Sequence, residues 1–440
     1  MNHPSLRHGL TSLCIVAGTL ATPAIAQPTW IGAWTASPQP TWGGDFAFPT
    51  NVPPTLANQT FRQVARIGLG GHRVRLVLSN EYGTRPLLIG AVHLARAGEA
   101  SAIDPQADRV VTFGGQPSVT VPAGAPVLSD PIDLDVPDRS RLAVSMWLPA
   151  RVEATTFHWD GRSTAWIAPG NRAAANRLDD AGATTTTARL FLSAIQVETP
   201  TPARAVVVIG DSITDGNGAT LDADTRWPDY LAARLAPSNV AVLNAGISGA
   251  RLLGDRMGAN ALARFDRDVL GQPRLSAVVV MLGINDIAWP GTAFDPQGEP
   301  PSPQALIAAY RQLIARAHAQ GVRVVGATLT PFEGALPGTP LDNYYDRGKD
   351  ALRERVNAWM RSSHEFDAVL DADALLRDPA HPARLRALFD SGDHLHPGDR
   401  GNEALAAAAN AELLFGAAPL RTATRWPRRR CPPRGPRRES

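Results

Sequence analysis

Five short apolar runs, each followed by a segment of helix length, occupy residues 204–416 and constrain the fold more than any other feature. The runs are AVVVIG, NVAVLN, LSAVVVML, VRVVGATL and DAVLDA. Continuous apolar strands joined by helices are typical of a parallel sheet that is covered on both faces. The intervening PSPQALIAAYRQLIARAHAQG has the spacing of an amphipathic helix, and DRGNEALAAAANAELLF predicts another. We therefore expect an α/β domain over 204–416 with a doubly wound, five-stranded parallel sheet.

The preceding residues, 27–200, follow a different pattern. Apolar residues alternate with polar ones in HRVRLVLSN and RLAVSMWLP, which is the period of half-buried strands. Gly, Pro and Asp separate these short runs, and no convincing helix occurs before about residue 172. The pattern predicts an antiparallel, jelly-roll-like β-sandwich, joined to the α/β domain by the linker TPTPAR at 199–204.

The two ends of the chain differ from these domains. Residues 1–26 have the form of a signal peptide: Arg7 precedes the apolar run GLTSLCIVAGTL, and Ala24-Ile25-Ala26 is a small-residue cleavage site. The run is shorter than the ~20 residues needed to span a bilayer. We therefore expect no membrane span, and a secreted or periplasmic protein cleaved after Ala26. Residues 417–440 are rich in Arg and Pro and are expected to be disordered.

The charge distribution and the residue usage argue against nucleic-acid binding, a lysine-containing phosphate-binding loop and an intrachain disulfide. The net charge of +2 combines +1 in the leader and +7 in residues 421–440, so residues 27–420 carry −6. A nucleic-acid partner is not expected for a body without a basic excess. Lys349 is the only lysine and precedes Asp350, so the phosphate-binding pattern G-x-x-x-x-G-K-[ST] is absent. The two cysteines, Cys14 and Cys431, leave the mature chain with no possible intrachain disulfide.

Polar residues follow four of the expected strands. They lie in GDS (210–212), NAGISG (244–249), GIND (283–286) and DSGDHLH (390–396). Because strand ends converge at one edge of a parallel sheet, these segments are expected to form one site. A serine hydroxyl needs a base, and the base needs an orienting carboxylate. Ser212 is therefore the candidate nucleophile, His396 the base and Asp393 the orienting residue.

Attack on an ester places negative charge on the carbonyl oxygen, and hydrogen-bond donors must stabilise it. The candidate oxyanion donors are the backbone N–H groups of Ser212 and Gly249 and the side-chain amide of Asn285. Each residue alone has a structural interpretation: Ser212 as a helix N-cap, Gly249 as a turn, Asn285-Asp286 as a cap or Asx-turn. The joint pattern favours a serine hydrolase. The two histidines of DHLH, His394 and His396, also allow a solvated loop or a metal ligand, but no H-E-x-x-H occurs, and no metal is expected.

The segments GDSITDG, NAGISG, GIND and DHLH resemble, in order, the four sequence blocks of the SGNH (GDSL-type) hydrolases. The resemblance implies a flavodoxin-like sheet, no cofactor, and the roles assigned above to Ser212, Gly249, Asn285, Asp393 and His396. The N-terminal half, opening with WIGAWTASPQP, resembles the β-rich domain of a secreted subgroup of arylesterases and acetylesterases. This second resemblance implies short acyl groups on carbohydrates, or aryl esters, as substrates.

Three further residues are expected at the substrate pocket. Asp211 adjoins Ser212, Trp289 follows Asn285 by four residues, and His158 lies in TFHWDGRST (156–164), a loop expected to reach the site. We expect the substrate to be a small-molecule or polysaccharide ester. Two alternatives remain at this level: a lipase, lysophospholipase or thioesterase, and a carbohydrate-binding surface protein with an inactive hydrolase domain. The oligomeric state does not follow from the sequence.

Overall fold

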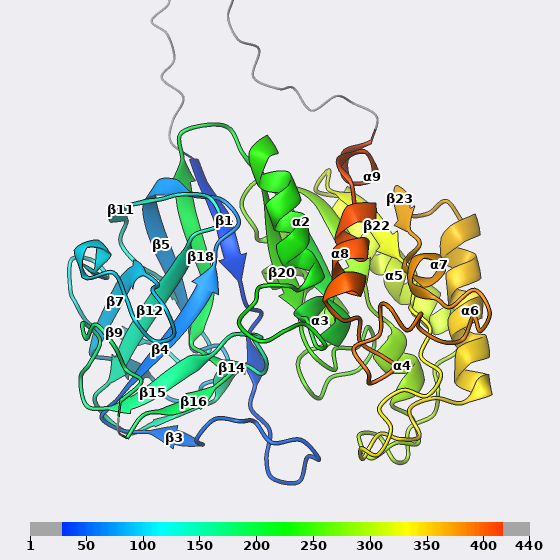
Figure 1. Cartoon of the computed structure of the whole chain (residues 1–440), viewed down its shortest axis with the longest axis horizontal. Coiled ribbons are helices and arrows are strands. Elements are labelled where there is room, and N and C mark those ends of the chain that lie inside the picture. The colour runs from blue at the N-terminus through cyan, green and yellow to red at the C-terminus, as the bar shows by residue number, and fades with distance from the viewer. Residues whose placement is uncertain (1–28, 181, 417–440) are drawn as a thin grey trace, which may run out of the picture.

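A computed structural model describes residues 29–180 and 182–416, which form a β-rich region and an α/β region side by side (Figure 1). The predicted leader, 1–26, and the predicted disordered tail, 417–440, lie outside the described residues. Within the described residues, no helix combines the length and the apolar character that crossing a membrane requires.

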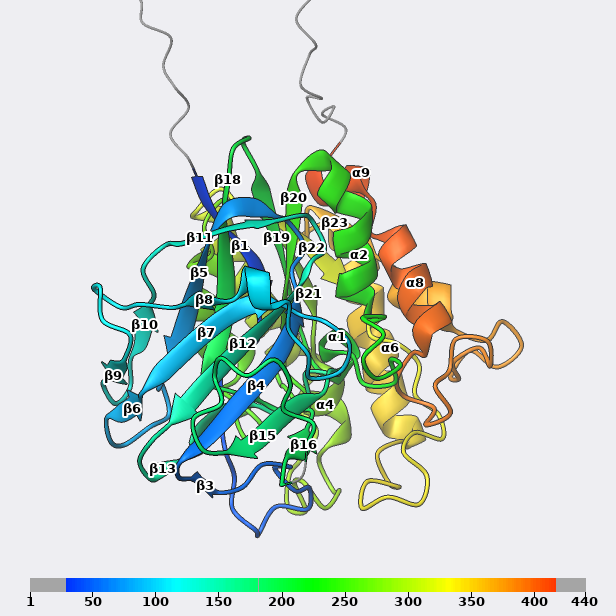
Figure 2. The ribbon, with the colours of Figure 1, turned by 60° about the vertical axis from the view of Figure 1, so that its left-hand side comes forward.

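The β-rich region contains two antiparallel sheets that pack on a common core, and Figure 2 brings the second of them to the front. The first sheet has the order β1 (Thr29–Thr35), β18 (Leu192–Thr199), β5 (Gly71–Ser79), β10 (Pro126–Leu128), with β11 (Ile132–Val136) also paired to β5. The second has the order β16 (Thr184–Thr186), β15 (Ala165–Pro169), β4 (Gln59–Arg66), β12 (Arg141–Leu148), β7 (Ala91–Arg96), β8 (Arg109–Val110).

Short strands and one helical turn complete this region. The strand groups are β13 (Val152–Glu153) with β3 (Thr55–Leu56), β6 (Leu87–Ile89) with β9 (Val119–Val121), and β14 (Thr156–His158) between β17 (Arg189–Leu190) and β2 (Gln39–Pro40). In the described part of the region the only helix is the 3₁₀ turn η1 (Pro105–Ala107). The alternation predicted in β5 is confirmed, because Val74, Leu76 and Leu78 are fully buried. The β-rich, antiparallel architecture follows from this alternation.

The α/β region contains the predicted five-stranded parallel sheet, in the order β20-β19-β21-β22-β23. Its strands are β19 (Arg204–Gly210), β20 (Val240–Gly246), β21 (Leu275–Met281), β22 (Arg323–Ala327) and β23 (Ala368–Leu370). The first strand in the chain lies between the second and third, which is the flavodoxin-like order. Gly210 is level with both Gly246 and Met281, so three strands end side by side.

Helices cover both faces of this sheet. One face carries α2 (Trp227–Leu235), α8 (Asp399–Ala408) and α9 (Ala411–Phe415), and the other carries α3 (Ala261–Phe265), α5 (Pro303–His318) and α6 (Arg347–Ser362). The remaining segments are α1 (Ser212–Asp215), α4 (Ile284–Ala288), α7 (Ala372–Leu376), the 3₁₀ turn η2 (Ala236–Ser238) and the π-helical turn η3 (Asp266–Leu270). In β19, Val206 and Val208 face the first group, and Val207 and Ile209 face the second. Burial on both faces explains why the strand sequence is continuously apolar.

One predicted helix is wrong in detail. DRGNEALAAAANAELLF forms two helices, α8 and α9, because the chain leaves the helical conformation at Ala409, and Asn410 begins a new helix. The Asn410 side chain accepts the backbone N–H of Leu413, which is the contact of an N-cap.

The two regions share one hydrophobic core. Strand β1 packs against β20, the edge strand of the parallel sheet (Figure 1). A Cβ at Gly32 would lie 2.8 Å from Leu243 Cδ1, so a larger residue here would require the Leu243 side chain to shift. Thr35 Oγ1 donates a hydrogen bond of 2.8 Å to the Asn244 carbonyl across the same boundary. The β-rich region therefore covers β20 on the face of the parallel sheet where α3, α5 and α6 also pack.

Candidate active site

The first strand end delivers Ser212 into a buried position. Asp211 is the N-cap of α1, and its carboxylate accepts the backbone N–H of Ile213 at 3.0 Å. The alternative interpretation of Ser212 as the cap is therefore wrong, since Asp211 occupies that position. As the first residue of the helix, Ser212 has an N–H that the helix does not use, and its hydroxyl is free for other contacts.

Ser212, His396 and Asp393 form a continuous chain of hydrogen bonds. Ser212 Oγ lies 2.7 Å from His396 Nε2, and His396 Nδ1 lies 2.6 Å from Asp393 Oδ2. The carboxylate can only accept, so Nδ1 carries a hydrogen and Nε2 is left to accept the Ser212 hydroxyl proton. Ser212 and His396 are 7% and 5% exposed, so bulk water competes little for these hydrogen bonds.

Asp393 is held in its ionised form. Burial alone would raise its pKa, but the hydrogen bond from His396, and the charge of that ring when protonated, hold the pKa well below its ordinary value. Backbone N–H groups of Leu395 and His396 donate to Oδ1 at 3.0 and 2.8 Å and add to this effect. The two-residue spacing of D-x-x-H thus lets one turn supply the carboxylate, the ring and two backbone donors.

Gly249 lies in a tight turn, residues 247–250, at a position that favours glycine. Ala250 N donates to Ile247 O at 2.9 Å, and Gly249 has a φ of +76°, as the third residue of a type II turn requires. A Cβ at Gly249 would lie 2.4 Å from Met257 Sδ. Among residues 29–180 and 182–416, the N–H groups of Gly249 and Ser212 have no hydrogen-bond partner.

Asn285 is oriented by two contacts. Its amide nitrogen donates to the Ala250 carbonyl at 3.0 Å, and its amide oxygen accepts the Tyr344 hydroxyl at 2.8 Å. The nitrogen keeps a second hydrogen that neither contact uses. Sequence reasoning missed Tyr344, which lies in a loop 59 residues after Asn285 and in no recognisable motif.

Asp286 fastens the third strand end to the second. Its carboxylate accepts the backbone N–H groups of Leu252 and Leu253 at 2.7 and 2.9 Å. The interpretation of Asn285-Asp286 as a local cap or Asx-turn is therefore wrong. Burial raises the pKa of Asp286 to about 6, and the two N–H donors limit the rise.

A pocket of about 300 Å³ opens over these groups, and both regions of the chain contribute to it. Ser212, Gly249, Asn285, Asp393 and His396 all line it. The α/β region adds apolar surface from Trp289, Phe294, Leu336, Leu341 and Tyr344, among others. The β-rich region adds Phe48, Trp159, Asp160 and Arg162. The loop 156–164 therefore reaches the pocket, and Trp289 lies there as expected.

Residues 208–404 match the model of the GDSL-like lipase/acylhydrolase family. This part of the chain is a GDSL-like hydrolase domain. The match includes all four segments that line the site, although 390–396 follows α7 and not a strand end as predicted. It identifies this domain as a carboxylic-ester hydrolase. Among curated proteins, no sequence matches this chain.

Solved structures of similar proteins align with about half of the chain. The native aryl esterase of M. smegmatis is 20% identical, with 47% of this chain and 96% of that chain covered and a TM-score of 0.37. An acetyl xylan esterase, AlAXEase, is 20% identical, with 46% and 96% covered and a TM-score of 0.35. A member of the lipolytic protein G-D-S-L family from Veillonella parvula DSM 2008 is 19% identical, with 47% and 96% covered and a TM-score of 0.34.

Two residues expected at the pocket of this hydrolase domain lie elsewhere. Asp211 is buried beneath Ser212, where it caps α1, and burial raises its pKa to about 7. His158 is 4% exposed and contacts Asp215, not the pocket. The prediction for Asp211 rested on its adjacency to Ser212, and that for His158 on the loop 156–164 that contains it. Neither determines the direction of a side chain.

The first histidine of DHLH, His394, takes no part in the hydrogen-bonded chain of Ser212, His396 and Asp393. His394 is at a positive φ of 62°, and its side chain is half exposed, 2.6 Å from Asp390. The interpretation of this histidine as part of a solvated loop agrees with its position. Within the described residues, no group of three or more His, Cys, Asp or Glu side chains could hold a metal ion.

Proposed function

We propose that this hydrolase is a serine esterase that works through an acyl-enzyme. The supporting observation is the hydrogen-bonded chain from Ser212 through His396 to Asp393, which opens into the pocket. Ser212 Oγ attacks the ester carbonyl while His396 Nε2 takes its proton. Asp393 keeps the ring in the required tautomer and stabilises the imidazolium that forms.

The negative charge formed in this attack requires donors that are already in place. We assign this role to the N–H groups of Ser212 and Gly249 and to the Asn285 amide. His396 then returns its proton to the alcohol oxygen, the C–O bond breaks, and the acyl group stays on Ser212. A water molecule, deprotonated by His396, releases the acid in the same way and restores the serine hydroxyl. Losing one oxyanion donor typically costs ~10²–10³ in rate.

Short acyl groups on carbohydrates, or aryl esters, are the proposed substrates. A volume of about 300 Å³ is at the lower end of small-ligand pockets. Phe48 and Trp159 stack with an interplanar angle of 12° at its rim, beside the polar Asp160 and Arg162. An aromatic surface next to polar groups suits a sugar ring or an aryl alcohol. We further propose, from residues 1–26, that the protein is exported and cleaved after Ala26.

Turnover of p-nitrophenyl esters from C2 to C16 tests this proposal. We expect the highest kcat/KM with acetate. Ser212→Ala should lower kcat by at least about 10⁴-fold, as loss of a serine nucleophile does elsewhere. Ser140→Ala, which changes an exposed hydroxyl bonded to Pro137, is the matched control and should retain full turnover.

Two results would contradict these assignments. Substantial turnover by purified Ser212→Ala would remove the nucleophile from the mechanism. A strong preference for C12–C16 esters would replace the carbohydrate or aryl substrate with a lipid. Assays on acetylated xylan, pectin and aryl acetates then separate the two proposed substrate classes. Edman sequencing of the exported protein should begin at Gln27, and an intact leader would contradict the cleavage site.

A further inference from the structure

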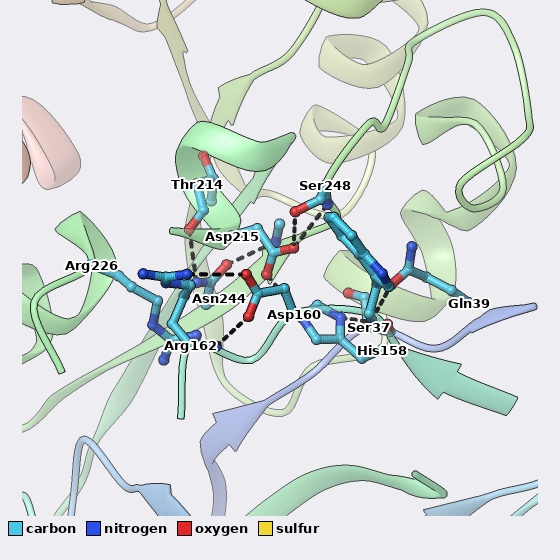
Figure 3. A network of polar contacts seen from close by, with 12 residues as sticks. Ser37, Gln39, His158, Asp160, Arg162, Thr214, Asp215, Arg226, Asn244 and Ser248 are labelled. Atoms are coloured by element: carbon cyan, nitrogen blue, oxygen red, sulfur yellow. Dashed lines mark hydrogen bonds and ion pairs between the residues drawn. The ribbon is translucent and has the colours of Figure 1, made fainter. Parts of the chain in front are cut away.

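Besides His396 and Asp393, a buried His–Asp pair lies beneath the Ile247–Ala250 turn, which presents the Gly249 N–H. His158, at the end of β14, lies with Nε2 2.8 Å from Asp215 Oδ1 and Nδ1 3.1 Å from the Ser37 carbonyl. Asp215 ends α1, three residues after Ser212. Figure 3 shows His158 on one side of the Asp215 carboxylate and Ser248 on the other. The side chains of His158 and Asp215 are 5% and 1% exposed.

The contacts of this pair define its charge state. The Ser37 carbonyl can only accept, so His158 Nδ1 carries a hydrogen. Asp215 accepts at both oxygens: Oδ1 faces His158 Nε2, and Oδ2 receives the Ser248 N–H at 2.8 Å and the Ser248 hydroxyl at 2.7 Å. An ionised carboxylate satisfies all three donors, and an imidazolium satisfies both acceptors. Burial alone would lower the pKa of His158, yet the charge and hydrogen bond of Asp215 raise it.

Asp215 thereby fixes the turn that presents Gly249. Both polar donors of Ser248 are held by one carboxylate oxygen, and Ser248 and Gly249 are the two central residues of the Ile247–Ala250 turn. The Gly249 N–H belongs to the peptide that joins these residues, so its direction depends on how Ser248 is held. A displacement of about 1 Å at such a donor can cost ~10² in rate.

Gln39, on β2 of the same region, supports the turn from another side. Its amide oxygen accepts the Trp159 N–H at 2.8 Å, and its amide nitrogen donates to the Met257 carbonyl. Met257 packs directly on Gly249. The short strands β2 and β14 therefore hold both the residue before Gly249 and the side chain that covers it.

We propose that His158 is a positioning residue for ester hydrolysis: its imidazolium holds Asp215 against Ser248 and so directs the Gly249 N–H toward the oxyanion. The inference rests on the proposed function, since it needs a reaction that develops an oxyanion. It gives the β-rich region a part in the chemistry, through a residue that never touches the substrate. His158 acts through Asp215, and Asp215 acts through Ser248.

Steady-state kinetics of p-nitrophenyl acetate hydrolysis test the inference with His158→Gln, Asp215→Asn and the double variant. Because a donor is displaced and not removed, we expect each single change to lower kcat by about 10- to 100-fold. KM should stay within about twofold, since the oxyanion forms only after binding. The double variant should be no slower than the slower single variant, because both changes break one connection.

His93→Gln is the matched control. His93 also pairs with an aspartate of the β-rich region, Asp108, at 2.9 Å, but it lies on β7, away from the pocket. It should keep wild-type kcat. Thermal unfolding of each variant establishes that the assay temperature lies below its transition. If His158→Gln does not fold, Ser248→Ala carries the test, because it removes one donor to Asp215 and should lower kcat by about 3- to 10-fold.

The outcomes separate this inference from the proposed function. Wild-type kcat in folded His158→Gln or Ser248→Ala would overturn the positioning role while leaving the serine mechanism intact. Multiplicative losses in the double variant would also overturn it, because His158 would then act independently of Asp215. Full turnover by Ser212→Ala would instead defeat the proposed function, and this inference with it.

Discussion

The direction of the Asn285 amide depends on a residue that no motif contains. The Tyr344 hydroxyl donates to the Asn285 oxygen at 2.8 Å, while the Asn285 nitrogen donates to Ala250 O at 3.0 Å. Tyr344 is 1% exposed and lines the pocket. Without its hydroxyl, a buried amide oxygen loses its donor, and the amide is free to rotate away from the position that an oxyanion needs.

The Tyr344→Phe variant tests whether Tyr344 orients the Asn285 amide, because it removes only the hydroxyl group. We expect kcat for p-nitrophenyl acetate to fall by about 3- to 10-fold, equivalent to one lost hydrogen bond of ~0.5–1.5 kcal/mol. KM should change little, because the contact matters most when charge develops. Tyr345→Phe, at the adjacent and half-buried position, is the control and should leave kcat unchanged. An unchanged kcat in Tyr344→Phe would show that Asn285 is oriented without Tyr344.

The sequence predicts site residues where a strand end determines their position, and fails elsewhere. Ser212, Gly249 and Asn285 lie together because parallel strands in register bring their ends to one edge. Tyr344 and His158 reach the site region through loops whose paths depend on tertiary packing. Their partners, Asn285 and Asp215, are 59 and 57 residues away in the sequence, and no local pattern encodes such contacts.

Among the elements, those with a long apolar period follow from the sequence. The five parallel strands and α5 are examples, because burial alone fixes where an apolar residue must lie. The strands β2, β14 and β17 are only two or three residues long and carry no period. They form because the surrounding sheets bring them together, and two of them, β2 and β14, carry the residues that support the Gly249 turn.

The cap of α1 connects helix stability with pH. Burial, helped by the nearby charge of Asp286, raises the pKa of Asp211 to about 7 from an ordinary value of 3.8, although the Ile213 N–H and His396 oppose the rise. The folded state therefore binds more protons than the unfolded state between these values. By linkage, the stability that Asp211 contributes decreases as the pH rises from about 4 to about 7.

Asp211→Asn should reveal this dependence, because asparagine caps a helix as well as aspartate does but does not titrate. We expect the free energy of unfolding of the variant, relative to wild type, to rise between pH 4.5 and pH 7.5 by on the order of 3 kcal/mol. Urea unfolding at the two pH values measures it. A relative stability that is constant with pH, or that falls, would show that Asp211 ionises freely in the folded protein.

In the whole molecule, the two regions are coupled through their core. The continuous apolar cluster includes Ile31 of β1 and Leu243 of β20, and β1 covers the face of β20 opposite to the one that α2 covers. The hydrolase domain therefore depends on the β-rich region both for burial of β20 and for the contacts of His158 and Gln39. The predicted division at 199–204 describes a change of sequence pattern, while the core continues across it.

This shared core predicts that the molecule unfolds as one unit. Ile31→Ala, in the β-rich region and 1% exposed, should destabilise the whole chain by about 2–5 kcal/mol, as large-to-small core changes do. Loss of esterase activity, near-ultraviolet circular dichroism and the calorimetric transition should then coincide, and all should shift together to lower temperature. Val110→Ala, at a residue 53% exposed, should shift none of them appreciably. Two separate transitions, with activity surviving the first, would contradict this prediction. The hydrolase domain would then fold without its β-rich cover, and the β1–β20 contact would add little to its stability.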